Sequence, residues 1–204
     1  MRTLAELLQA SVAHHRTLCP RQVLGVRMGM FAGEMLDLDL PQADKRLLTI
    51  VETDGCVTDG LAAATGCWVG RRTLRVEDFG KVAATFIDTH TERALRVVPR
   101  GEARTLARQY APGETDRWRA QLVGYQRMPD EKLLRWEWVT LTTPLRLIVA
   151  SEGVRVVCDM CQEEIINDRQ VVRDGSVVCR ACAGQAYYRH IEASELVSEL
   201  FNAV

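Results

Sequence analysis

The chain has 204 residues, a length that suits one full domain with a small appendage. Hydrophobic residues make up 47% of it and charged residues 26%, so most of the chain can bury a core without help from a metal ion. The formal net charge of −1 excludes a general electrostatic attraction to nucleic acid or to an anionic membrane.

Targeting segments are not evident in the sequence. No stretch approaches the roughly 18 consecutive apolar residues of a membrane span, and the first fifteen residues lack the continuous apolar segment of a signal peptide. We therefore expect a cytoplasmic protein without membrane contact, in which the seven cysteines are reduced. In that compartment, clustered cysteines indicate metal binding or catalysis rather than disulfides.

The N-terminal third predicts two helices, a strand and a third helix. Residues 3–13 carry apolar side chains at helical spacing, and Pro20 suits the first turn of a helix that runs to about Leu36. The run 47–51 is of buried-strand type. A helix over 57–65 follows, and Gly66 is placed to end it.

The middle of the chain predicts three strands, two helices and a further strand. The strands are expected at 73–76, 83–88 and 94–98, the helices at 102–109 and 115–126, and the last strand around Leu134, Trp136 and Trp138. We expect the large side chains Trp118, Trp136 and Trp138 in the core or at a dimer interface. This order predicts an α+β fold, a mixed sheet with packed helices.

The strongest motif lies near the C-terminus. Cys158-x2-Cys161 is followed after seventeen residues by Cys179-x2-Cys182. Two Cys-x2-Cys pairs can present four thiolates to one tetrahedral ion, and zinc suits such a site better than iron or a redox pair. Because four protein ligands leave no open position, we expect a structural zinc site without catalytic function.

The segment around these cysteines predicts a small domain of its own. A hairpin is expected with its turn at Asp174-Gly175, and the second cysteine pair is expected to open a helix through Tyr187, Tyr188 and Ile191, in treble-clef order. We therefore predict two domains, 1–150 and 151–204. The first has 21 basic and 18 acidic residues, and the second has 5 and 9, which counts against nucleic-acid binding by the finger.

A second group of candidate ligands lies in the N-terminal domain. His15 and Cys19 are four residues apart, Cys56 starts the expected third helix, and Cys67 follows that helix. Asp54 can add a carboxylate. Imidazole, thiolate and carboxylate together suit a divalent transition metal, and a helix N-terminus is expected to lower a thiol pKa. The alternative is that these cysteines are ordinary buried residues.

These stretches resemble the FmdE family, named for the E component of formylmethanofuran dehydrogenase. The resemblance rests on four motifs and covers nearly the whole chain: His15-x3-Cys19-Pro20; Glu52-Thr53-Asp54-Gly55-Cys56 with Thr65-Gly66-Cys67; Asp78-Phe79-Gly80-Lys81; and the segment Tyr125–Leu133 followed by the four-cysteine finger. It implies a shared α+β core, a metal-binding cleft near the His/Cys cluster, and an intertwined homodimer.

The sequence departs from the family pattern in ways that bear on the core site. Thr17 stands where the family has a second histidine, and Arg16 replaces the glycine before it. Arg71 and Thr73 replace the Lys and Asn of the usual Gly-Lys-x-Asn-Leu. If the missing histidine is a ligand in the family, the core site is weakened or altered here.

Three functions are compatible with these patterns. The first is a metal-binding accessory or sensor protein, with a metal or small ligand in the core cleft and a possible protein partner. The second is a metal- or thiolate-dependent enzyme that uses Cys56 or Cys19 with His15 as proton carrier. The third, a nucleic-acid-binding regulator, is disfavoured by the acidic finger.

Overall fold

The computed structural model describes residues 2–13, 17–149 and 153–191. The chain divides into two compact units, Met1–Leu145 and Arg146–Val204. The first contains a five-stranded mixed sheet with helices, and the second contains two small two-stranded sheets. The predicted α+β fold with a small C-terminal four-cysteine domain is confirmed. Within the described ranges, no helix has the length and apolar character needed to cross a membrane.

The sheet of the first unit has the strand order β2-β1-β3-β4-β5. Its strands are β1 Leu47–Val51, β2 Leu74–Val76, β3 Ala84–Asp88, β4 Ala94–Pro99 and β5 Leu134–Val139. Strand β1 runs parallel to β2 and antiparallel to β3, and the remaining pairs are antiparallel. Every residue of the central strand β3 is buried, including the polar Thr85 and Asp88.

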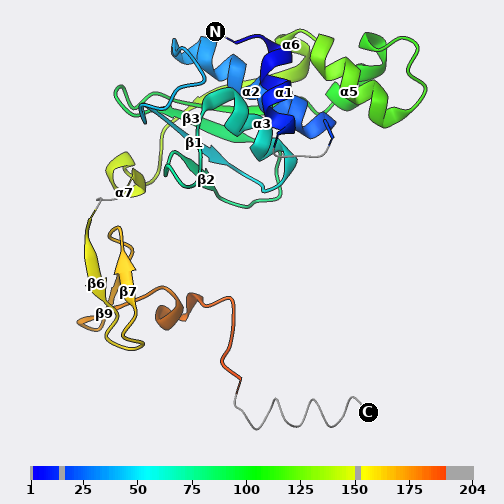
Figure 1. Cartoon of the computed structure of the whole chain (residues 1–204). Helices are drawn as coiled ribbons and strands as arrows, with labels where there is room; N and C mark the ends of the chain where they lie inside the picture. Colours follow the sequence, from blue (N-terminus) through cyan, green and yellow to red (C-terminus); the bar gives the residue numbers. More distant parts are fainter. Residues whose placement is uncertain (1, 14–16, 150–152, 192–204) are drawn as a thin grey trace, which may run out of the picture. The chain divides into compact units, whose positions relative to one another are not determined.

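Helices α1, α2 and α3 pack together over strands β1 and β3 (Figure 1). The helical segments of this unit are α1 Leu4–Val12, α2 Pro20–Leu36, α3 Cys56–Thr65, α4 Ala103–Leu106, η1 Ala107–Tyr110, α5 Arg117–Arg127 and α6 Asp130–Leu133. A further short helix, α7 Leu145–Val149, begins at the boundary between the units. The shared core includes Leu7, Val23, Leu61, Phe86 and Leu95, each at most 1% exposed.

Glycines let the backbones of α2 and α3 touch. A Cβ atom on Gly25 would collide with the carbonyl oxygen of Val57, and one on Gly60 would collide with the carbonyl oxygen of Gln22. Both collisions involve backbone atoms, which cannot rotate away as a side chain can. The crossing lies only six residues after Cys19 and four residues after Cys56. It therefore holds the N-terminal ends of the two helices close together.

A buried ion pair fixes the loop that leads from β1 into α3. Glu52, 7% exposed, accepts hydrogen bonds from Nε and Nη2 of Arg96 at 2.6 and 2.8 Å. Its backbone carbonyl accepts the N–H groups of Phe79 and Lys81 at 2.9 and 3.1 Å. The loop that leads to Cys56 is thus bonded at its first residue to strand β4 and to the loop between β2 and β3.

Over residues 153–191, the second unit forms two hairpins and one helical turn. Its strands are β6 Arg155–Val157, β7 Glu164–Ile166, β8 Val171–Arg173 and β9 Ser176–Val178. The predicted turn is confirmed, since Asp174 and Gly175 join β8 to β9 with φ of 51° and 81°. Positive φ at both central residues is the geometry that Asp-Gly favours in a tight hairpin.

The helix expected after the second cysteine pair is a single turn, η2, Ala181–Gln185. Gly184 adopts a left-handed φ of 91°, which ends the turn, and residues 186–191 are not helical. Tyr187 is 98% exposed and buries no apolar surface that could support a longer helix. The prediction of a helix through Tyr187, Tyr188 and Ile191 is therefore wrong.

Candidate metal centres

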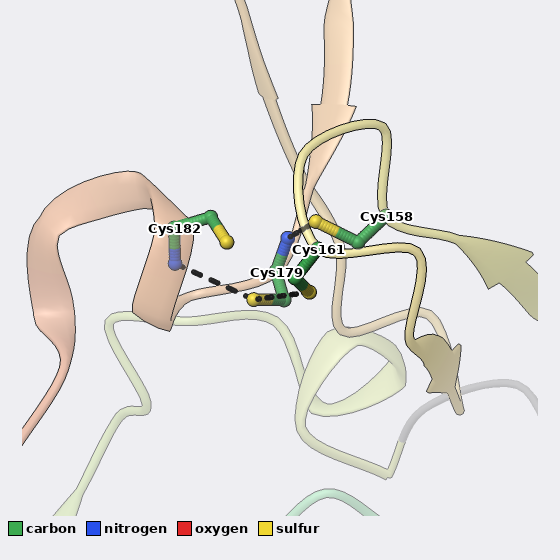
Figure 2. Close-up of side chains that lie close together, drawn as sticks. All are labelled: Cys158, Cys161, Cys179 and Cys182. Atoms are coloured by element: carbon green, nitrogen blue, oxygen red, sulfur yellow. Dashed lines mark hydrogen bonds between the residues drawn. The ribbon is translucent and has the colours of Figure 1, made fainter. Parts of the chain in front are cut away.

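Four cysteine sulfurs converge in the second unit. Figure 2 shows Cys158 and Cys161, from the loop after β6, facing Cys179 and Cys182, from the end of β9 and the turn η2. The four Sγ atoms all lie within 4.8 Å of one another. The two Cys-x2-Cys motifs, seventeen residues apart in sequence, thus form one four-thiol cluster that could hold a metal ion.

The cluster fits a tetrahedral ion. An ion with metal–sulfur bonds of about 2.3 Å requires sulfurs about 3.8 Å apart. The Sγ atoms of Cys161 and Cys179 are 3.9 Å apart. Backbone N–H groups also point at the sulfurs: that of Cys179 donates to Cys158 Sγ at 3.3 Å, and that of Cys182 donates to Cys179 Sγ at 3.4 Å.

These contacts give the thiols of the cluster different pKa values. Backbone N–H donors from Cys161 and Cys179 lower the pKa of Cys158 to about 6. The hydrogen bond with the neighbouring Cys179 sulfur raises the pKa of Cys182 to about 12. Adjacent thiols cannot all become thiolates without a compensating cation, so binding of an ion would release protons from the cluster.

The apolar core that the described residues of the second unit form is very small. Its buried members are Cys158, Ile165 and Val178, with residues such as Val156 and Val171 packed against them. A core of this size gives little burial free energy against the entropy of ordering the chain. Metal binding is therefore expected to hold this unit folded.

The first unit places Cys19 and Cys56 together. Cys19 is the N-cap of α2 and Cys56 is the first residue of α3, and both are half-buried. They line one cavity of about 790 Å³, within the usual size range of small-molecule sites. Gln22 fixes the start of α2, because its Oε1 accepts the backbone N–H of Cys19 at 2.9 Å.

The pKa expectation for Cys56 is wrong in its direction. Burial, followed by the hydrogen bond and the charge of Cys19, raises the pKa of the Cys56 thiol. The helix N-terminus favours the thiolate, but burial beside a second sulfur outweighs it. In the absence of a metal ion, Cys56 is therefore a neutral thiol at neutral pH.

Two other expected core ligands, Cys67 and Asp54, are not part of the cavity lining. Cys67 follows the C-terminal end of α3, whereas Cys56 begins this helix. Because a ten-residue helix is about 15 Å long, the two cysteines lie at opposite ends of α3. The buried sulfur of Cys67 donates to the carbonyl of Leu47 and accepts from the hydroxyl of Thr49, both at 3.4 Å. Asp54 is exposed on the loop before α3. His15 lies outside the described residues.

Within the described part of the chain, the C-terminal cluster is the one group of three or more nearby Cys, His, Asp or Glu side chains that could hold a metal ion. A core ion bound at Cys19 and Cys56 would therefore need a further ligand. Two of the sequence's histidines, His14 and His15, fall outside the described residues.

Comparison with known proteins identifies the family of the first unit. The model of the FmdE family, described as "FmdE, Molybdenum formylmethanofuran dehydrogenase operon", matches residues 14–135, more than half of the chain. The chain belongs to the FmdE family. The match contains both Cys19 and Cys56 and ends before the four-cysteine unit, so that unit is additional to the FmdE core.

Two further proteins are similar to this FmdE-family chain. A tungsten formylmethanofuran dehydrogenase FmdE-like protein from Syntrophus aciditrophicus has the same fold, with a TM-score of 0.58, 19% identity, and coverage of 92% of this chain and 96% of that one. A probable S-adenosyl-L-methionine-binding protein from Archaeoglobus fulgidus is 29% identical over 90% of this chain. The chain spans 54% of that relative's length, so the ligand in its name is not carried over.

Sequence reasoning missed the rest of the cavity wall. Besides the two thiols, the cavity is lined by Arg21, Arg100, Arg104 and Trp118, among others. These residues come from α2, the segment after β4, α4 and α5, so no short motif contains them. Trp118, expected in the core or at a dimer interface, is 47% exposed and lines the cavity.

Proposed function

We propose that this FmdE-family chain is a metal-binding accessory or sensor protein that holds a divalent transition metal at Cys19 and Cys56. The observation that carries the proposal is the pairing of these two thiols on one wall of a ligand-sized cavity. Two thiolates are good ligands for zinc and related ions, and a site with only two or three protein ligands stays open to a small molecule.

His15 is the proposed third ligand. It lies four residues before Cys19 in the sequence, and an imidazole would complete a donor set with a strong preference for divalent transition metals. Asp54 and Cys67 remain weaker candidates, because the first is exposed outside the cavity wall and the second lies at the other end of α3.

The four-cysteine unit is proposed to bind structural zinc. The 3.9 Å separation of two of its sulfurs fits a tetrahedral ion, and four thiolates satisfy zinc without redox chemistry. We propose that this unit stabilises the C-terminal fold and offers a surface to a protein partner, in a cytoplasmic homodimer. Residues 151–204 include 5 basic and 9 acidic residues, and this negative charge disfavours the binding of nucleic acid by the unit.

The enzyme alternative is the weaker one. A cysteine nucleophile needs an accessible thiolate, whereas burial and the neighbouring sulfur raise the pKa of Cys56. A metal-dependent reaction at the same cavity stays compatible with the geometry. It would require a substrate that is converted, and not merely bound, by the metal-loaded protein.

Cobalt(II) substitution tests the proposed ligands. Thiolate-bound cobalt absorbs in the near ultraviolet, and the intensity reports the number of sulfur ligands. The cobalt-loaded Cys19→Ala and Cys56→Ala proteins should each lose part of this absorption, while the matched Cys67→Ala protein should keep it. Full wild-type absorption in both cavity variants would exclude a core metal at these thiols.

A further inference from the structure

The cavity beside Cys19 and Cys56 has a strongly one-sided charge. Of the fifteen described residues that line it, three are arginines and none is acidic. Arg21 comes from the first turn of α2, Arg100 follows β4, and Arg104 comes from α4. Three guanidinium groups from separate elements, facing one cavity, create a positive potential that a small anion would neutralise.

A hydrogen bond orients one of the three arginines, and a second lies near a tyrosine hydroxyl. Nε of Arg100 donates to the carbonyl oxygen of Leu134 at 3.0 Å, which fixes the plane of a half-buried guanidinium on the cavity wall. Arg104 lies against the hydroxyl of Tyr125, whose pKa is raised by burial and partly lowered again by this arginine. Planar guanidinium groups held in this way suit the bidentate recognition of carboxylate or phosphate.

Two helices add to the positive potential. Both α2, with 17 residues, and α3, with 10, begin at the cavity wall, so their N-terminal dipole ends lie near the same space. The neighbouring surface hollow contains one acidic side chain, Asp116, whose Oδ1 accepts the backbone N–H of Arg119 at 2.8 Å as the cap of α5. That hollow also contains Arg117, a further positive charge.

We propose that the cavity binds a small oxyanion, a carboxylate or phosphate group, held by Arg21, Arg100 and Arg104 next to the metal-binding thiols. Trp118 offers an exposed aromatic face to the uncharged part of the same ligand. This inference deepens the proposed function, because an oxyanion ligand would occupy a coordination position that Cys19 and Cys56 leave open. The volume of about 790 Å³ is sufficient for a ligand of more than one functional group.

Calorimetric titration of the metal-loaded full chain tests the inference. Inorganic phosphate and malonate are the probes, each measured against sodium chloride of equal ionic strength. One saturable binding event per chain is expected. Tighter binding of phosphate would identify a phosphorylated ligand, and tighter binding of malonate would identify a carboxylate ligand; both results support the oxyanion site.

Three variants show whether the arginines are responsible. Arg21→Gln and Arg104→Gln alter exposed side chains, so folding should be kept, and each should weaken the preferred probe about tenfold. Arg119→Gln, on α5 but outside the cavity lining, should bind as the wild type does. The inference fails if neither probe saturates, if both cavity variants keep wild-type affinity, or if the control loses as much affinity as they do.

The metal content separates this test from that of the proposed function. Arg104→Gln should keep the wild-type metal content, since the arginine is not a ligand. If Cys56→Ala leaves the metal content unchanged, the core metal is refuted, while weakening of the anion by Arg104→Gln still supports the oxyanion site. If Cys56→Ala removes one ion and no probe binds, the metal site stands and the oxyanion inference fails.

Discussion

Replacement of Gly60 by alanine tests the helix crossing on which the thiol pair depends. In an isolated helix the change would stabilise by about 1 kcal/mol, because alanine has the higher helix propensity. In this fold the new Cβ would collide with the carbonyl oxygen of Gln22 and would lie 3.0 Å from the backbone nitrogen of Val26. Overpacking against backbone atoms costs about 1–3 kcal/mol, and relief requires α3 to move away from α2.

We therefore expect Gly60→Ala to lower the free energy of unfolding by about 1–3 kcal/mol. Urea unfolding followed by circular dichroism measures this, and core metal affinity should fall at the same time as the two helix ends separate. Gly70→Ala is the matched control, since a Cβ there meets nothing within 4 Å. A Gly60→Ala protein as stable as the wild type, or more stable, would refute the close crossing.

Three further predictions concern the supports of the two units. Glu52→Gln should destabilise the first unit by about 1–3 kcal/mol in urea, because the amide nitrogen cannot accept one of the two hydrogen bonds from Arg96 and the other loses its charge. Burial alone would raise the pKa of Asp88, but hydrogen bonds from Arg46 and the following turn lower it from 3.8 to about 2. Its stabilisation is thus present above about pH 4 and lost as the pH falls toward 2, so the stability deficit of Asp88→Asn in acid titrations should shrink over that interval. Cys158→Ala should expose the second unit to proteolysis without changing the unfolding of the first.

Much of the fold could be predicted from the sequence because its signals are local. Pro20 and a long apolar pattern predicted α2 with its observed bounds, and Gly66, with φ of 75°, ends α3 as expected. The apolar run of β1 and the Asp174-Gly175 turn were equally clear. These features depend mainly on neighbouring residues in the sequence, so tertiary packing does not change them.

The candidate sites show where sequence reasoning is limited. The four-cysteine cluster was predictable, since Cys-x2-Cys spacing by itself brings two sulfurs to one ion. The separation of Cys67 from Cys56 was also available, because a helix between them sets a distance of about 15 Å. The length of the turn η2 around Cys182 could not be predicted in this way. It is short because Tyr187 has no apolar surface to pack against.

The cavity arginines could not be found from the sequence. Only three of the 26 basic residues are lysines, so arginine is common along the whole chain and its position in the sequence carries little information. Arg21, Arg100 and Arg104 meet through tertiary packing of three elements. Trp136 and Trp138 lie on the predicted strand. Trp136 packs against the core, with its ring centre 4.7 Å from that of Phe31. Trp138 is exposed, and the guanidinium of Arg93 stacks on its ring.

The metal-to-protein ratio of the purified full chain decides whether the core metal site exists. It should be measured for the wild type and for Cys56→Ala, Cys67→Ala and Cys158→Ala prepared in parallel. We expect two ions per chain in the wild type and in Cys67→Ala, and one ion in each of the other two variants, with Cys56→Ala retaining the ion of the four-cysteine unit. A ratio of one in the wild type that Cys56→Ala leaves unchanged would contradict a metal site at Cys19 and Cys56.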